Sequence, residues 1–369
     1  MSIENRHRDF FPFIHILRGL APVIVMWAHL GPWFVMDKMD NRWAVLDPWH
    51  QHVALPLHLY QNGGHFGVLI FFLVSGFIIT FASIRETLGE FFIKRILRIF
   101  PALCFALVVA FIARWVALEL GLGKLTNMQA DGWMDFVRAF FLLDLILGKN
   151  QVIGVTWSLV SEIMFYLLTA LFITRTRSKP ELSTYMMIGC WSAFELTAAG
   201  LPELSRMKYF SPYVAMLILG RVIYLADSGV LGWRKGLPMA ALVALIFILI
   251  YTNAHQGSFF SGPQAPVASY ALAIAIFLAA MTYGFDRVPK FLSFLADISL
   301  SLYLLHIPVG MLFNTVAISR GVPFALSFPV SIILCLAVSW LSFKYIEKPS
   351  QKLARSLIAS RTGSRLSAI

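Results

Sequence analysis

Long runs of apolar residues constrain the fold of this chain more than any other feature. The runs are about 18–24 residues long, enough to cross the hydrocarbon core of a bilayer as an α-helix. Lipid offers backbone groups no hydrogen bonds, and the runs lack the alternation of an outer-membrane barrel. Only 13% of residues are charged and 59% are hydrophobic, too little charge to coat a soluble protein of 369 residues. The sequence therefore predicts an all-α polytopic membrane protein with about ten transmembrane helices, over residues 12–35, 66–84, 98–118, 155–174, 184–200, 210–227, 237–253, 267–284, 293–316 and 326–346.

Lysine and arginine set the predicted orientation. With a cytoplasmic N-terminus, the inner segments hold more than twice as many of these residues as the outer ones, as the positive-inside rule requires. The apolar stretch 135–147 is too short to span and is predicted to be a short non-spanning helix. Both termini are then cytoplasmic. We expect a single transmembrane domain over residues 1–350 and a basic cytoplasmic tail over 351–369. This topology accounts for the net charge of +11 without a nucleic acid partner.

Ionisable side chains inside the spans are candidate functional residues, because a bilayer penalises charge. Arg18 and His29 lie 11 residues apart in the first span, so both face one side of the helix, about three turns apart. Glu162 in the fourth span lies at a depth similar to that of His29. We expect this carboxylate to orient His29 as a general base. The alternatives are that Arg18 snorkels, that His29 bonds a neighbouring carbonyl, and that Glu162 is protonated or paired with another polar group.

A basic cluster precedes the third span, on the predicted cytoplasmic side. It consists of Lys94, Arg95 and Arg98 in FFIKRILRIFPAL. Arg95 and Arg98 share a helix face, and two guanidiniums suit a phosphate-bearing ligand. Ordinary anchoring at the membrane surface is the alternative interpretation.

Three further polar residues lie within apolar spans. Tyr303 and His306 in ISLSLYLLHIP are expected to line a polar cavity or to make interhelical hydrogen bonds. Ser75 is followed by Gly76, which favours close helix packing, and Ser75 lacks the neighbours of a nucleophile. The histidines of the first outer loop are irregularly spaced, so no metal site is expected.

Six motifs occur in order along nearly the whole chain. In chain order they are FIHILRGLAPVIVMWAHL with Arg18 and His29; GHFGVLIFFLVSGFIIT with Ser75; FFIKRILRIFPAL with Arg95 and Arg98; TWSLVSEIMFYLL with Trp157, Ser158 and Glu162; LADISLSLYLLHIPV with Tyr303 and His306; and FKYIEKP with Glu347. Together they resemble the acyltransferase family 3 membrane proteins, which O-acylate surface polysaccharides and related acceptors.

The resemblance implies a membrane O-acyltransferase of the bacterial inner membrane. The implied donor is a cytoplasmic acyl-CoA, most often acetyl-CoA, and the implied acceptor is a hydroxyl of a glycan or similar molecule. His29 is the expected general base, Arg18 is expected to act with the donor, and Trp157 and Ser158 fall on a pocket motif. A proton-coupled secondary transporter of an anionic or glycolipid substrate is the alternative. Homo-oligomerisation is left open.

Overall fold

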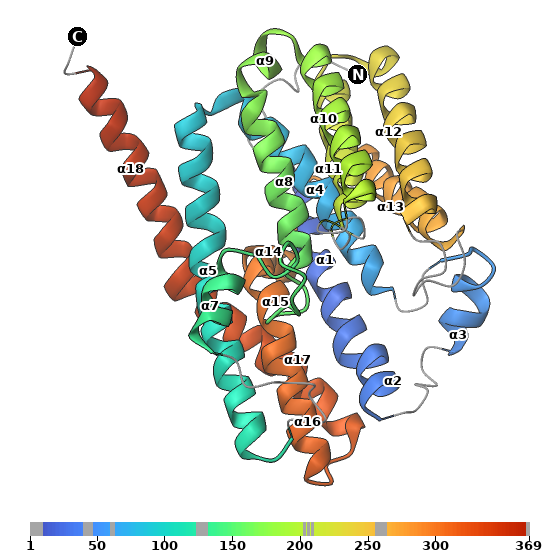
Figure 1. Ribbon diagram of the computed structural model, residues 1–369, viewed down its shortest axis with the longest axis vertical. Coiled ribbons are helices and arrows are strands. Elements are labelled where there is room, and N and C mark those ends of the chain that lie inside the picture. The colour runs from blue at the N-terminus through green and yellow to red at the C-terminus, as the bar shows by residue number, and fades with distance from the viewer. Residues whose placement is uncertain are drawn as a thin grey trace.

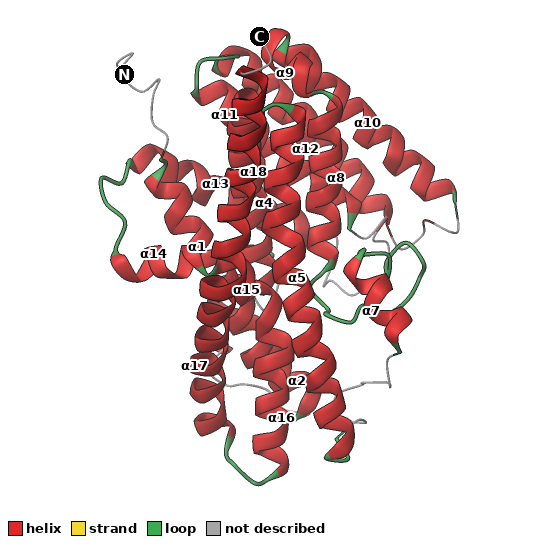
Figure 2. Ribbon diagram, turned by 90° about the vertical axis from the view of Figure 1, so that its left-hand side faces the viewer, coloured by secondary structure: helices red, strands yellow, loops and turns green. Residues whose placement is uncertain are grey.

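All regular elements that the computed structural model describes are helical (Figure 2). It describes residues 10–39, 47–59, 63–122, 132–201, 204, 207, 210–254 and 264–366. The elements of the N-terminal half are α1 (Pro12–Ala28), the π-helical turn η2 (His29–Trp33), α2 (Phe34–Lys38), α3 (Asp47–Trp49), the π-helical turn η4 (His50–Ala54), α4 (Gly64–Arg85), α5 (Leu88–Glu119), α7 (Trp133–Phe140), α8 (Trp157–Leu171) and α9 (Ile173–Ser178).

The C-terminal half continues in the same way. Its elements are α10 (Pro180–Gly200), the 3-10 turn η7 (Ser211–Tyr213), α11 (Val214–Asp227), α12 (Trp233–Ala254), α13 (Gln264–Tyr283), α14 (Lys290–Asp297), α15 (Ser299–Leu305), the π-helical turn η8 (His306–Met311), α16 (Leu312–Ser319), α17 (Phe324–Ser342), the π-helical turn η9 (Phe343–Glu347) and α18 (Lys348–Leu366).

Helices coincide with each of the ten predicted spans. Within the described residues, six helical stretches are long and apolar enough to cross a membrane: Pro12–Lys38, Gly64–Arg85, Leu88–Glu119, Trp233–Tyr251, Ser299–Ser319 and Phe324–Ser360. Shorter apolar helices cover Trp157–Leu171 and Val267–Tyr283. The two remaining predicted spans correspond to α10 and α11. The chain is therefore a polytopic α-helical membrane protein.

Two of the predicted spans begin at other residues in the structure than the sequence predicted. The span predicted at 98–118 starts ten residues earlier, because Thr87 and Glu90 form a capping box at the start of α5 (Leu88–Glu119). The basic cluster is thus part of the helix. The span predicted at 293–316 starts at Ser299, because the helix breaks at Ile298 and α14 is a separate short helix packed on α1.

The short helix predicted at 135–147 is α7, and it ends early, at Phe140. Leu142 has a positive φ of 57°, which a continuing helix does not allow. Asp144 in the following turns accepts a hydrogen bond from Arg138 Nε at 2.6 Å. This contact folds residues 141–147 back on α7 as turns.

The centre of the bundle is formed by α4, which packs on both α1 and α11. A Cβ on Gly76 would lie 2.0 Å from the carbonyl oxygen of Leu217, and one on Gly220 would lie 2.3 Å from that of Leu73. The backbones of α4 and α11 therefore meet at a distance that only glycine allows. The close packing predicted at Gly76 is confirmed.

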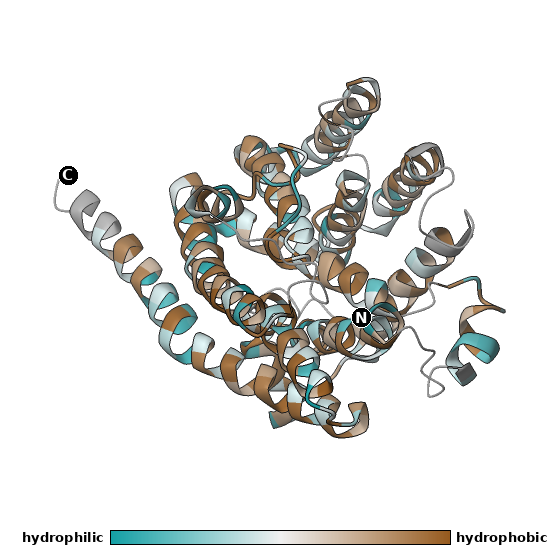
Figure 3. Cartoon of the chain, turned by 60° about the horizontal axis from the view of Figure 1, so that its bottom comes forward, coloured by the Kyte–Doolittle hydropathy of each residue, from teal (hydrophilic) through white to brown (hydrophobic). Residues whose placement is uncertain are grey.

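Large apolar side chains cover the outward faces of the outer helices. On α5 these include Val108, Ile112 and Trp115, the last 62% exposed. Figure 3 shows hydrophobic residues along the peripheral helices. In water these faces would be costly, so they are the surface that meets lipid.

The two ends of the bundle agree with the predicted parity of crossings. Figure 1 shows α9 and the C-terminal part of α18 at one end and the connection between α16 and α17 at the other. The first two are basic segments predicted to be cytoplasmic, and the connection is predicted to lie outside. The predicted tail 351–369 is helical through residue 366 and extends from α17 along α5.

Candidate functional site

Helix α1 carries two of the predicted site residues on one side. The Nε of Arg18 donates a hydrogen bond to Ser299 Oγ at 3.0 Å. His29 opens the π-helical turn η2, and its Nδ1 lies 3.0 Å from the carbonyl oxygen of Val25. Eleven residues of helix separate the two side chains by about 16 Å along the axis. Helix α15, which packs on α1, begins at Ser299 and so holds the Arg18 end of this face.

His29 is paired with a second histidine. The Nε2 of His306 lies 3.2 Å from His29 Nδ1, and the ring centroids are 5.1 Å apart. His306 is fully buried, whereas His29 is half-buried. Of the two alternatives for His306, an interhelical hydrogen bond is therefore the one that forms, and its partner is the predicted base.

A cavity of about 120 Å³ lies between α1, α4 and α5. Arg18, Ser75 and Arg98 line it together with His15 and aromatic and aliphatic side chains of α1 and α4, including Phe71. Two guanidiniums from different helices thus face one space, close enough to repel each other. Such a lining suits a ligand that has an anionic part and an apolar part.

Glu162 lies beside this cavity but is not hydrogen-bonded to His29. Its Oε1 accepts hydrogen bonds from Ser75 Oγ at 2.8 Å and from Tyr166 Oη at 2.6 Å. The predicted pairing with His29 rested on similar depth in the membrane. Helix α8 packs on α4, α10 and α11, however, whereas α1 packs on α4, α14 and α15. Glu162 consequently points at α4 and at the arginines of α5.

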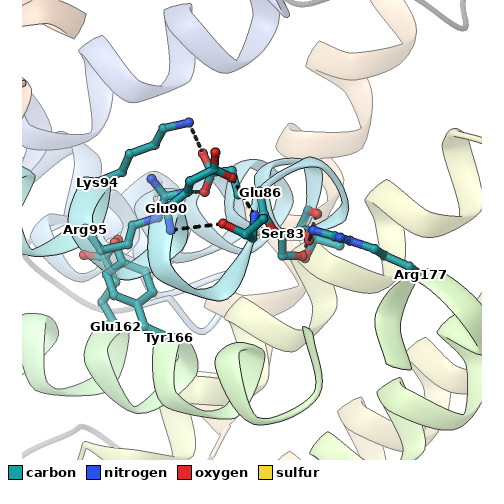
Figure 4. A network of polar contacts seen from close by, with 10 residues as sticks. Ser83, Glu86, Glu90, Lys94, Arg95, Glu162, Tyr166 and Arg177 are labelled. Carbon is teal, nitrogen blue, oxygen red and sulfur yellow. Dashed lines mark hydrogen bonds and ion pairs between the residues drawn. The ribbon is translucent and has the colours of Figure 1, made fainter. Parts of the chain in front are cut away.

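The basic cluster divides into two environments. Lys94 Nζ and Arg95 Nη2 both bind the carboxylate of Glu86, at 2.9 Å and 3.2 Å. Figure 4 shows this network, in which Arg177 also donates to the backbone oxygen of Glu86. Arg98, one turn further along α5, lines the cavity instead. Sharing a helix face was therefore not enough to give Arg95 and Arg98 the same contacts.

The remaining predicted pocket residues do not line the cavity. Ser158 Oγ lies 2.7 Å from Tyr303 Oη, which also donates to the carbonyl oxygen of Val155 at 3.1 Å. The Tyr303 ring stacks on Phe71 at 6.0 Å and lies 6.1 Å from the His306 ring. Tyr303 thus contacts both Phe71, which lines the cavity, and His306. Trp157 packs against the aromatic rings of Phe72, Phe210 and Tyr213 and does not line the cavity.

Sequence reasoning missed the residues that hold these side chains. Tyr166 follows Glu162 by four residues and so faces it on one helix, a signal that was available. Glu86 precedes the basic cluster closely enough to have suggested a counter-ion. Ser299 as the partner of Arg18 had no signal, because it comes from a distant part of the chain.

Acidic side chains balance the cationic lining. Glu347 of η9 is buried and is bound by the backbone N–H and hydroxyl of Ser301, and its charge acts on both Arg18 and Arg98. In the part of the chain that the structure describes, no three His, Cys, Asp or Glu side chains are placed to hold a metal ion.

Comparison with known proteins gives a match along most of the chain. A family model described as "Acyltransferase domain" matches residues 11–344. Nodulation protein 10 of Rhizobium leguminosarum bv. viciae is 27% identical, and the alignment covers 97% of each chain.

Two further relatives are longer. The putative peptidoglycan O-acetyltransferase YrhL of Bacillus subtilis is 24% identical over 95% of this chain, and the peptidoglycan O-acetyltransferase OatA of Listeria monocytogenes is 23% identical over 94%. This chain spans 56% of the length of each. No solved structure gives a significant match.

Proposed function

The chain belongs to this acyltransferase family, and from that premise we propose that it moves an acyl group, in the simplest case acetyl, from a cytoplasmic acyl-CoA to a hydroxyl of a glycan. The two relatives named as peptidoglycan O-acetyltransferases support a glycan acceptor. We place the protein in a bacterial inner membrane. The observation that carries the proposal is the cavity that Arg18 of α1 shares with Arg98 of α5. His29 directly follows the end of α1.

The donor is held by the cationic lining of the cavity. Arg18 and Arg98 bind its anionic part, and the aromatic and aliphatic lining receives its apolar arm. Arg98 has no hydrogen-bond or ion-pair partner among the described side chains, so it is available to a ligand. Lys94 and Arg95 extend the positive surface toward the predicted cytoplasmic end, but they share the carboxylate of Glu86 and must exchange it for phosphate.

The acyl group is transferred at His29. The Nε2 of His29 takes the proton from the acceptor hydroxyl while that oxygen attacks the thioester carbonyl. The carbon–sulfur bond breaks, and the thiolate leaves as a thiol with the proton that His29 returns. Glu162 acts on the donor side of this site, because it holds Ser75 in the cavity wall and balances the nearby guanidiniums.

Transfer from radiolabelled acetyl-CoA to a glycan by the purified protein in lipid nanodiscs tests the proposal. His29→Ala should lower turnover by about 10²–10⁴, the usual contribution of a general base. His52→Ala is the matched control, because His52 is exposed in η4, outside the site. Near-normal turnover of His29→Ala at equal expression would remove His29 from the mechanism.

Donor binding is tested separately. Arg98→Ala should raise the KM for acetyl-CoA, whereas Arg234→Ala, an exposed arginine near the start of α12, should not. The transporter alternative makes a different prediction, namely exchange of substrate across the membrane in the absence of acyl-CoA. Family membership favours an acyltransferase over a transporter. Formation of an acylated product only in the presence of acyl-CoA would decide in favour of the acyltransferase.

A further inference from the structure

We propose that His306 is a positioning residue for His29, and that it fixes the His29 ring with the proton on Nδ1 and a bare Nε2 facing the acceptor. This inference rests on the proposed function, in which His29 is the general base. It assigns a partner for the base on α15/η8 in place of Glu162.

The protonation of His306 follows from its neighbours. Its Nδ1 lies 3.1 Å from the carbonyl oxygen of Leu302, one turn earlier in α15. A carbonyl oxygen only accepts hydrogen bonds, so Nδ1 carries the proton. In the neutral ring, Nε2 is then an acceptor. This nitrogen is the one that faces His29.

The protonation of His29 follows in turn. Its Nδ1 lies 3.0 Å from the carbonyl oxygen of Val25 and 3.2 Å from the Nε2 of His306. Both atoms are acceptors, so Nδ1–H is a donor that the two share. The neutral His29 ring therefore keeps a lone pair on Nε2, the form that a general base needs.

Two π-helical turns bring these rings together. His29 is the first residue of η2 and His306 is the first residue of η8, and the two turns contact each other. Each turn contains a proline, Pro32 or Pro308, whose missing N–H and bulky ring disfavour a regular α-helical turn. Such widened turns concentrate at functional sites.

Close packing fixes the register of the two turns. A Cβ on Gly310 would lie 2.6 Å from a methyl carbon of Leu30 and 2.9 Å from Cys335 Sγ. The segment after His306 is therefore in direct contact with the residue after His29. Rotation or sliding of either turn would break this contact as well as the hydrogen bond between the rings.

The pairing has a direct consequence for proton transfer. When Nε2 of His29 takes a proton from the acceptor hydroxyl, the positive ring still donates from Nδ1 to His306 and Val25, and a charge-assisted hydrogen bond is stronger than a neutral one. The proton then leaves from Nε2 to the departing thiolate. His306 is fully buried with Nε2 turned to His29, so it acts through His29 and not on substrate.

A matched pair of substitutions separates positioning from packing. His306→Gln places an amide oxygen near the position of Nε2 and keeps an acceptor for His29. His306→Asn keeps a donor for Leu302 and loses the acceptor. We expect Asn to lower kcat by on the order of 10- to 100-fold with little change in the KM for acetyl-CoA, and Gln to stay within a few-fold of the wild type. Equal activity of the two variants would overturn the assignment.

Nitrogen NMR of ¹⁵N-histidine-labelled protein gives a readout that packing alone does not change. The His29 signals, identified by their loss in His29→Ala, should show a protonated Nδ1 and a bare Nε2, and His306→Asn should shift the Nδ1 signal, because Nδ1–H then keeps only the Val25 carbonyl as its acceptor. A protonated Nε2 in the unaltered protein refutes the inference even if the variants do not fold. An inactive His29→Ala would in that case leave His29 as the proposed base, whereas an active one would remove His29 from the mechanism.

Discussion

Glu86→Gln tests whether Lys94 and Arg95 bind the donor or only brace the turn between α4 and α5. In the structure both cations bind the Glu86 carboxylate, at 2.9 Å and 3.2 Å. A phosphate can bind them only by displacing this carboxylate. Glutamine keeps the shape of the side chain and removes its charge, so the displacement should become easier.

The expected size of the effect comes mainly from Arg95. The Lys94 side chain is 37% exposed and its pairing is screened by water, whereas the Arg95 and Glu86 side chains are only 10% and 11% exposed. A hydrogen bond to a charged partner contributes about 1 kcal/mol more than a neutral one. Losing that difference should lower the KM for acetyl-CoA about fivefold, since about 1.4 kcal/mol is a factor of ten.

The assay is the dependence of transfer rate on acetyl-CoA concentration at fixed glycan. Glu90→Gln is the control, because it removes the same charge from the same turn while glutamine can still complete the capping box with Thr87. A KM that is unchanged or higher in a folded Glu86→Gln protein, together with a lower Tm, would refute the donor role. Lys94 and Arg95 would then be structural.

Three other predictions concern packing, the cavity wall and α7. Gly76→Ala should lower the Tm in detergent by many degrees, because the new Cβ would lie 2.0 Å from Leu217 O, while Gly189→Ala, with open space around it, should not; equal Tm values would contradict the packing. Ser75→Ala should retain turnover within about tenfold, because Ser75 donates to Glu162 and serves as wall; a trapped acyl-serine would instead indicate a covalent intermediate. The hydrogen bond from the Gly132 N–H lowers the pKa of Asp135, so the stability it gives α7 is present above the ordinary aspartate pKa and is lost as pH falls through the lowered value. Hydrogen exchange over Trp133–Phe140 should rise there, and exchange independent of pH after correction for intrinsic rates would contradict this.

The helices were predictable because each apolar run must form its own backbone hydrogen bonds in lipid. The boundaries of the helices were less predictable, because hydropathy does not reveal local features such as the Thr87 capping box and the break at Ile298. Spacing placed Arg18 and His29 correctly on one face. Which helices become neighbours is not written in any single span, and the assumed pairing of Glu162 with His29 failed for that reason. Two residues at the same depth in the membrane come into contact only if their helices are neighbours and their side chains face each other.

Helix α15 fixes both ends of the reactive face of α1. Ser299 binds Arg18 and His306 binds His29, so the two parallel helices are held at two points. The axial separation of these two positions, about 16 Å along the helix, is thereby set by the fold. Phe71 lines the cavity and stacks on Tyr303, and Tyr303 lies against His306. In the proposed mechanism an acyl group held beside Arg18 has to reach His29, so we propose that Phe71 moves to let it pass.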